Sequence, residues 1–154
     1  MEVRRLEEHY AKFGDALVRL ASTMVGPSDA EDVVSRVMVS MLQTEAPDPD
    51  DLGAYLYRSV ANAARQHWRS MDRRSRREAL SRSLERYEHH EYIPEVLAAL
   101  AALSPQQRAA IHLTYWEDLT PAAVAGRLGV SEGTVRRQLA RARHKLAEVL
   151  HEIR

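Results

Sequence analysis

The stretch from 119 to 150 constrains the fold most, because nearly every residue in it belongs to one of two helices or to the tight turn between them. Thr120 can cap the first helix through its hydroxyl, and Pro121 stands at the first helical position, where its missing N–H costs nothing. Gly129 follows this helix as a residue able to take positive φ, and Ser131 can cap a second helix. The apolar face of the second helix recurs at helical spacing at Val135, Leu139, Ala142 and Leu146.

The opposite face of the second helix is basic. It carries Arg136, Arg137, Arg141, Arg143 and Lys145. This pattern predicts a helix-turn-helix whose second helix can enter the major groove with its N-terminal side chains on base edges. Ser131 and Thr134, short polar residues at the start of the helix, could also bind phosphates there. The alternative is an αα-hairpin with a hydrated arginine face, since such faces are common on protein surfaces.

Composition argues against several classes of site. The 154-residue chain has no cysteine, so it forms neither disulfides nor thiolate zinc sites, which fits a cytoplasmic protein. It has no long apolar run of the kind found in membrane spans and signal peptides. The seven histidines follow no ligand pattern, and we predict no metal site and no cofactor. No Ser/His/Asp order, carboxylate pair or glycine loop indicates an enzyme.

The net charge of zero conceals an uneven distribution. Residues 1–57 hold 5 basic and 11 acidic side chains, a net of −6. Residues 58–86 hold 9 arginines against 3 acidic side chains, a net of +6, and residues 127–145 hold 6 basic side chains against one, a net of +5. Two separate basic segments predict two contacts with an anionic partner, for which nucleic acid is the default.

Apolar periodicity predicts three helices in the first half of the chain. They cover residues 1–25, about 29–42 with Ser28 or Asp29 as the cap, and about 52–69, with a loop at 46–51. Periodicity is lost over 70–93, where we expect a basic helical tail passing into a flexible linker. Order resumes near Pro94, and Ser104-Pro105-Gln106-Gln107 reads as a capping box with proline at the first helical position.

The predicted fold is therefore all-α, with two small helical domains joined by a flexible linker, the C-terminal one a helix-turn-helix. We place the domains at 1–75 and 95–154 and the linker at 76–94.

With both halves in view, the chain resembles the extracytoplasmic-function (ECF) sigma factors of the sigma-70 family. The resemblance covers about residues 10–150 in the family's order and spacing. In the first half it is carried by Ser28-Asp29-Ala30-Glu31-Asp32-Val33-Val34 and by Ala54-Tyr55-Leu56-Tyr57-Arg58-Ser59-Val60-Ala61-Asn62 with the arginine run after it. In the second half it is carried by Ala99-Leu100-Ala101-Ala102-Leu103-Ser104-Pro105-Gln106-Gln107-Arg108, Gly129-Val130-Ser131-Glu132-Gly133-Thr134-Val135-Arg136 and Arg141-Ala142-Arg143-His144-Lys145-Leu146.

The resemblance implies a role for each half. The first half (region 2) would dock on a coiled coil of the largest subunit of core RNA polymerase through Asp29, Glu31, Asp32, Ser35 and Arg36. The same half would unwind the −10 element and hold a flipped base through Arg58, Asn62, Arg65, Trp68, Arg69, Arg73 and Arg74. The second half (region 4) would read the −35 element through Ser131, Thr134, Arg136, Arg137, Arg141, Arg143 and Lys145. Promoter DNA and core polymerase are the implied partners, and the factor itself would catalyse nothing.

The chain departs from the family pattern at a few positions. Arg36 stands where the family has an acidic residue, so it reverses a charge at the expected polymerase contact. Ala61, Gln66 and Ala123 replace a common Arg, Asp and Glu. ECF sigma factors commonly pair with an anti-sigma factor that lies between the two domains, so we expect such a partner. The alternative to a sigma factor is a stand-alone helix-turn-helix regulator that does not bind core polymerase.

Two side-chain roles stay open. Trp68 could stack on a base, which contributes about 1–3 kcal/mol per base, or it could complete the core of the first domain. Its place in the apolar series of the third helix favours the core. The run Arg73-Arg74-Ser75-Arg76-Arg77 could bind phosphates or form a hydrated linker.

Overall fold

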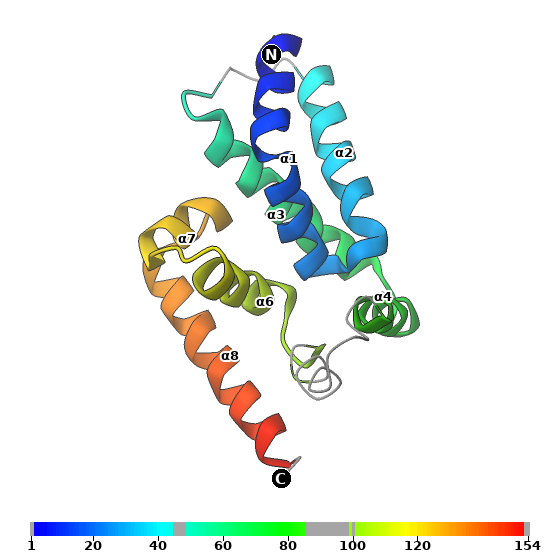
Figure 1. The fold of residues 1–154 in the computed structure, drawn as a ribbon, viewed down its shortest axis with the longest axis vertical. Coiled ribbons are helices and arrows are strands. Elements are labelled where there is room, and N and C mark those ends of the chain that lie inside the picture. Colours follow the sequence, from blue (N-terminus) through cyan, green and yellow to red (C-terminus); the bar gives the residue numbers. More distant parts are fainter. Residues whose placement is uncertain (1, 45–48, 86–98, 100, 153–154) are drawn as a thin grey trace.

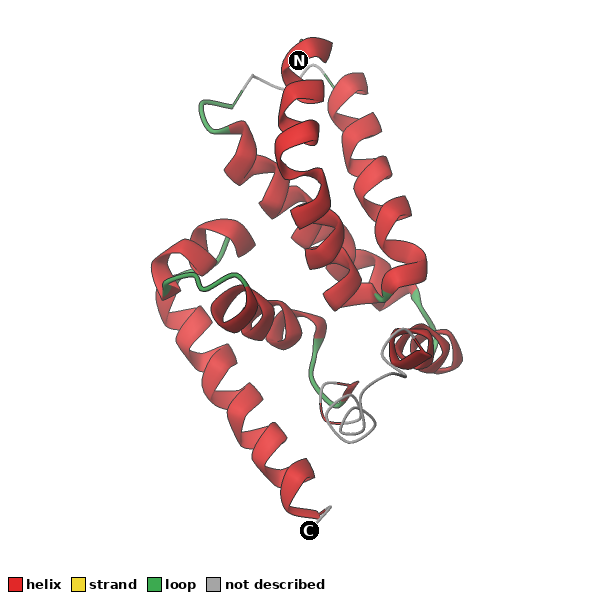
Figure 2. Ribbon diagram, viewed as in Figure 1, coloured by secondary structure: helices red, strands yellow, loops and turns green. Residues whose placement is uncertain are grey.

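The computed structural model describes residues 2–44, 49–85, 99 and 101–152. In these ranges the regular elements are all helical (Figures 1 and 2), which confirms the predicted all-α class. They are α1 (Val3–Val25), α2 (Pro27–Gln43), α3 (Leu52–Ser70), α4 (Arg73–Glu85), α6 (Pro105–Ile111), the π-helical turn η1 (His112–Trp116), α7 (Pro121–Leu128) and α8 (Glu132–Glu152). Among the described residues, no helix combines the length and apolar character needed to cross a membrane.

Helices α1, α2 and α3 pack side by side and form the first half of the molecule (Figure 1). Gly26, with φ of 92°, separates α1 from α2, and Pro27 takes the first position of α2. The expectation that Ser28 or Asp29 caps α2 is therefore wrong. Both residues lie inside the helix, because Pro27, whose φ is already fixed near the helical value, takes the first position and starts the helix before them.

The buried face of α3 follows the expected spacing. Asp51 caps the helix by accepting a hydrogen bond of 2.9 Å from the Ala54 N–H. The fully buried apolar side chains are Leu52, Leu56, Val60 and Ala64. Tyr57 is buried as well, whereas Tyr55 is 37% exposed. Tyr57 is covered because a ring from α1 and a guanidinium from α7 lie against it, and neither contact can be read from the periodicity of α3.

Helix α4 occupies the first ten residues of the segment predicted as a linker. Asp72 starts the helix by accepting a hydrogen bond of 2.7 Å from the Ser75 N–H, which also lowers the pKa of this carboxyl group. Ala79 is buried against Gly26, where an added Cβ would lie 2.9 Å from the Ala79 carbonyl oxygen. The absence of a side chain at Gly26 thus lets α4 approach the α1–α2 corner. Residues 86–94 of the predicted linker lie outside the described residues.

The second half confirms the predicted caps. Ser104 and Gln107 form a complete capping box at the start of α6. Thr120 caps α7, Gly129 takes the left-handed conformation with φ of 67° at its end, and Ser131 accepts a hydrogen bond of 3.1 Å from the Thr134 N–H at the start of α8. The apolar face of α8 packs inward as expected, with Val135, Leu139 and Ala142 buried and Leu146 partly buried.

The π-helical turn η1 continues directly from α6. The backbone widens after Ile111, and the Glu117 N–H donates to the His112 carbonyl five residues back, at 3.1 Å. Tyr115 and Trp116 are left 56% and 70% exposed.

The two halves share a continuous hydrophobic core. Helix α1 lies against α6, and α3 lies against α7, so the helix-turn-helix rests on the three-helix half (Figure 1).

Two glycines near the turn give a matched test of this local structure. Gly129→Ala should lower the free energy of unfolding by about 1–2 kcal/mol, since alanine is strained at positive φ. Gly126→Ala should raise it by about 0.5–1 kcal/mol, because Gly126 is helical and exposed and an added Cβ meets nothing within 4 Å. Urea unfolding of both variants measures these changes. Equal signs for the two substitutions would contradict the assigned turn geometry.

Candidate nucleic-acid interface

The basic face of α8 is exposed, and several of its side chains are held in place. Arg136 lies 3.2 Å from Glu132, and Arg137 donates to the Thr134 hydroxyl at 3.1 Å. Arg141 is exposed on the same helix. Because Arg136 and Arg137 stand in the first two turns, their guanidinium groups lie near the N-terminal end, which is the part of a recognition helix that reaches base edges.

The first and last residues of the predicted −35 set contact other protein groups. The hydroxyls of Ser131 and Thr134 form a hydrogen bond of 2.9 Å with each other at the N-terminus of α8. Arg143 turns toward η1 and donates two hydrogen bonds to the Tyr115 hydroxyl, at 2.7 and 3.1 Å. Lys145 donates to the Ala102 carbonyl at 3.4 Å. The predicted residues therefore all lie along α8 or at its start, but the two C-terminal members, Arg143 and Lys145, are already engaged by neighbouring protein groups.

Helix α3 brings together four of the predicted −10 residues. Asn62 accepts a hydrogen bond from Arg65 one turn away. Arg58 and Arg69 are exposed, and a Cβ placed on Gly129 would lie 3.1 Å from Cδ of Arg58. The N-terminal part of this surface is thus in contact with the turn of the helix-turn-helix.

Trp68, at the far end of α3, is partly buried, and two guanidinium groups lie over its ring. The carbon at the centre of the Arg108 guanidinium lies 4.6 Å from the ring centroid, and that of Arg76 lies 5.3 Å from it. Arg76 also donates two hydrogen bonds to the Trp68 carbonyl, at 2.9 and 3.0 Å. Trp68 packs against the core while keeping an aromatic face that cations favour.

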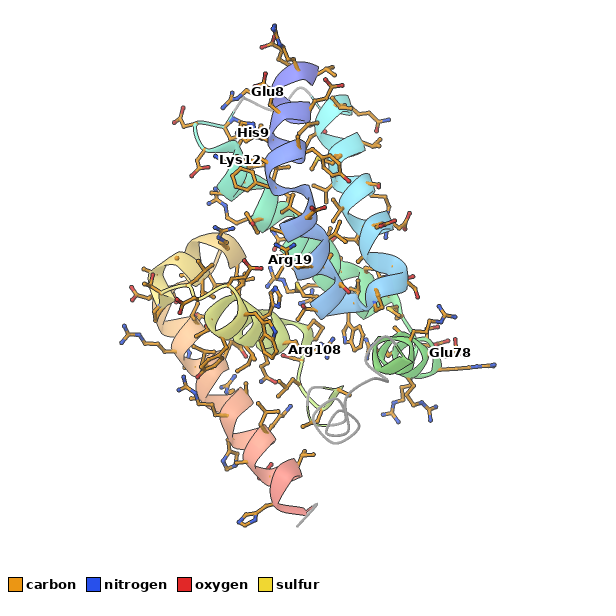
Figure 3. All side chains as sticks on the ribbon, in the orientation of Figure 1. Glu8, His9, Lys12, Arg19, Glu78 and Arg108 are labelled. Carbon is orange, nitrogen blue, oxygen red and sulfur yellow. The ribbon has the colours of Figure 1, made fainter. Side chains whose placement is uncertain are left out.

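The remaining −10 candidates lie on α4. Arg73 and Arg74 are exposed, and Arg74 pairs with Glu78 at 3.1 Å. Figure 3 labels Glu78 on α4. Such an exposed pair contributes little to stability and leaves the guanidinium accessible. Of this arginine run, Arg76 is the member that turns inward to Trp68.

The predicted polymerase-binding residues lie along α2. Glu31, Asp32 and Ser35 are exposed. Arg36, the residue that departs from the family pattern, lies 3.2 Å from Asp32 and 3.0 Å from Nδ1 of His67.

His67 was missed by sequence reasoning and links two of these residues. Its Nε2 lies 2.9 Å from the Asp29 carboxylate. Because Arg36 has donors and no acceptor, Nδ1 of His67 must accept, and Nε2 must donate to Asp29. His67 therefore joins α3 to both the acidic start and the basic middle of α2. No spacing rule within one helix could have revealed it.

Arg108 is a second residue that sequence reasoning did not single out. It is 4% exposed and donates to the carbonyl oxygens of Thr23 at 2.9 Å, Met24 at 2.7 Å and Leu103 at 2.6 Å. Burial lowers the pKa of its guanidinium to about 10, which leaves it protonated at neutral pH. Two of its acceptors lie in the last turn of α1, where the helix dipole favours a cation.

Arg108 belongs to a contact region between the halves, which we call the seam. Its residues are Arg19, Tyr57, Arg58 and Trp68 in the first half and Arg108, Glu117, Arg127 and Gly129 in the second. Arg127 lies over the Tyr57 ring with 3.9 Å to the centroid, and Arg19 lies 3.6 Å from Glu117. Figure 3 shows Arg19 and Arg108 where α1 meets the second half.

His112 lies beside the seam. Its Nε2 is buried, lies 3.5 Å from Glu117 and makes no hydrogen bond to the described residues. The pKa of the imidazole is lowered, chiefly by burial and further by Arg19, while Glu117 opposes the shift.

This shift predicts a pH dependence of stability. A histidine whose pKa is lower in the folded state binds more protons when unfolded, so stability is lost as pH falls below its unfolded value of 6.5. His112→Phe keeps a ring against Trp116, with which His112 stacks at 6.4 Å, and removes the titration. Urea unfolding between pH 7.5 and 5.5 should show a smaller loss of stability in the variant than in the wild type. Parallel pH profiles would rule out this role of His112.

Family comparisons cover both halves. Residues 9–74 match the sigma-70 region 2 model, and residues 94–146 match the sigma-70 region 4 model. RNA polymerase sigma-E factors of Streptomyces avermitilis and Streptomyces coelicolor are each 31% identical over 97% of this chain, which spans 87% and 88% of their lengths.

Solved structures show the same arrangement of helices. CnrH in complex with the cytosolic domain of CnrY is 27% identical, with a TM-score of 0.66 over 98% of this chain and 90% of that one. The sigma factor RpoE of Bartonella quintana, in complex with the anti-sigma factor NepR, is 23% identical with a TM-score of 0.63 over 99% and 100% of the two chains, and shows the fold alone. With region 2 and region 4 in order and relatives matched along nearly its whole length, the chain belongs to the ECF sigma factors of the sigma-70 family.

Proposed function

We propose that this sigma factor directs core RNA polymerase to its promoters through three separate surfaces, with α8 reading the −35 element, α3 with the start of α4 opening the −10 element, and α2 docking on the polymerase. The observation that carries the proposal is the exposed arginine face of α8, held on a helix-turn-helix with complete caps. We assign residues 1–75 to the region 2 domain, 76–94 to the linker and 95–154 to the region 4 domain.

Duplex reading at −35 needs a rigid helix with donors at its N-terminal end. Arg136 and Arg137 meet this requirement because each is oriented by a partner on its own helix. Arginine can donate twice to guanine in the major groove, so these two residues are assigned to base edges. Arg141, Arg143 and Lys145 lie farther along α8 and are assigned to phosphates, and Ser131 and Thr134 to the phosphate nearest the helix N-terminus.

Strand opening at −10 needs cations for the backbone and a flat surface for a flipped base. Arg58, Asn62, Arg65 and Arg69 supply polar groups on one side of α3, and Arg73 and Arg74 continue that charge onto α4. Trp68 stands where the two helices meet. Its aromatic face can take an unstacked base in place of a guanidinium.

Polymerase docking is assigned to the exposed residues of α2. Asp29, Glu31 and Asp32 give its start a negative field, and Arg36 sits one turn beyond, paired with Asp32. Pairing offsets part of the reversed charge, so docking is retained with Ser35 and Arg36 as contact residues. The factor supplies binding and strand separation, and the polymerase performs the chemistry.

The working context of the protein is the bacterial cytoplasm, where polymerase and promoters are found. An anti-sigma factor is the proposed regulatory partner. Support comes from the two solved relatives, one recorded with the anti-sigma factor NepR and one with the cytosolic domain of CnrY.

Run-off transcription with purified core polymerase and a genomic promoter pool tests the proposed function. Adding the protein should yield specific new transcripts, and their aligned upstream sequences should share elements near −10 and −35. No new transcript, together with no complex on gel filtration, would leave a helix-turn-helix regulator that acts without the polymerase.

Single arginine substitutions separate base reading from phosphate binding. Arg136→Ala should relax preference at one −35 base pair, at a cost of about 1–3 kcal/mol on the preferred sequence. Arg141→Ala should weaken binding to all sequences alike and lower the salt slope by about one unit. Equilibrium binding of the intact protein to matched and mismatched −35 duplexes at several salt concentrations measures both effects. A uniform loss in Arg136→Ala would remove its assignment to a base edge.

A further inference from the structure

We propose that His67 is a positioning residue of the polymerase-docking surface, where it holds the guanidinium of Arg36 against the protein so that the carboxylates of α2 meet the partner. The inference rests on the proposed docking role of α2 and deepens it, because it assigns a part in docking to a residue of α3. The partner surface that fits this arrangement is a basic one.

The start of α2 lies beside the end of α3 (Figure 1), and one imidazole links the two helices. The Nε2–H of His67 donates to the Asp29 carboxylate at 2.9 Å, and Nδ1 accepts from the Arg36 guanidinium at 3.0 Å. The side chain of His67 is 20% exposed, whereas that of Arg36 is 58% exposed. The half-buried ring is therefore the fixed member of this contact, and it determines where the longer arginine side chain lies.

The hydrogen bond to Asp29 prepares the ring for Arg36. Nδ1 can accept from a guanidinium only while it carries no proton, and a carboxylate on Nε2 favours that tautomer of the neutral imidazole. Asp29 is thus more than a second partner of His67. It keeps the acceptor that Arg36 uses pointed toward α2.

The charges of α2 explain why the position of Arg36 matters for docking. The helix carries Asp29, Glu31 and Asp32, and Arg36 is its one basic residue. Asp29, Asp32 and Arg36 follow each other at intervals of three and four residues, so they share a face of the helix. A partner attracted by the carboxylates would be repelled by a free guanidinium among them, since like charges across an interface oppose binding.

Asp32 would hold Arg36 only weakly by itself. The two side chains lie 3.2 Å apart as an exposed pair one turn apart, and such pairs contribute little and are screened by salt. His67 adds an acceptor from a second helix, so the guanidinium is bound by both α2 and α3. Arg36 can then take part in docking without presenting an unpaired charge to the polymerase.

Substitution of the ring tests the proposal through affinity for core polymerase. His67→Phe keeps a ring of similar size and removes both the acceptor for Arg36 and the donor to Asp29. It should weaken docking by about two- to fivefold, mainly through a slower association rate, because the freed guanidinium adds repulsion at a distance. Fluorescence anisotropy of the intact protein with a dye at its N-terminus, titrated with purified core polymerase, measures both quantities.

A double-mutant cycle separates positioning from packing. Arg36→Gln removes the charge that His67 is proposed to hold, so His67→Phe in that background should change the affinity by less than about 1.5-fold. The loss in the single variant should also shrink as the salt concentration rises, because salt screens charge repulsion and leaves a packing defect unchanged. A loss of equal size with and without Arg36, at low and high salt alike, would overturn the proposal.

Two further histidine substitutions complete the test. His67→Asn places an amide oxygen near the position of Nδ1 but is too short to reach Asp29, so it should recover most of the affinity that His67→Phe loses. Recovery of none of it would contradict the need for an acceptor. His9→Phe makes the same change at a partly buried histidine of α1 that contacts its own helix, and should leave docking unchanged.

Urea unfolding confirms that each variant is folded before its affinity is compared. If His67→Phe does not fold, His67→Ala takes its place in the cycle, since alanine favours the helix and adds no bulk. Binding of the wild type distinguishes the two proposals. No binding to core polymerase would remove the docking role of α2 and that of His67 with it, whereas binding without coupling to Arg36 would overturn only the role of His67.

Discussion

The buried guanidinium of Arg108 is the interaction on which the arrangement of the two halves depends. A cation that is 4% exposed is stable only if its donors are satisfied, and here three carbonyl oxygens, two of them at the C-terminal end of α1, receive them. The geometry of that helix end therefore determines where α6 can sit. With α6 in this position, α7 packs against α3, and the remaining contacts of the seam can form.

Arginine is used in two different ways in this chain. On α8 it stands exposed and oriented by short contacts within the helix, as a polyanion requires. In the seam it lies on aromatic rings and carbonyl groups, where its flat and weakly hydrated group tolerates burial. The same residue type, placed on a helix in each case, can serve either purpose. Only the position of the partner helix decides which.

The local features of the fold could be predicted from sequence, and the long-range ones could not. The helix caps and the left-handed turn residue depend on residues a few positions apart, so the sequence pattern alone predicts them. They are Ser104, Thr120, Ser131 and Gly129. The extent of α4 could not be predicted, because a surface helix of arginine and serine has little apolar periodicity. The His67–Arg36 contact and the seam join residues 31 to 98 positions apart, and nothing in their spacing marks them.

The chemistry of the seam also determines how it responds to salt. Its described contacts are mainly between guanidinium groups and neutral partners, and its ion pair, Arg19 with Glu117, is loose and partly exposed. Such contacts are weakly screened, whereas binding to DNA phosphates falls steeply with salt because counterions are released. Raising the salt concentration should thus weaken binding to DNA phosphates much more than it weakens the contacts of the seam.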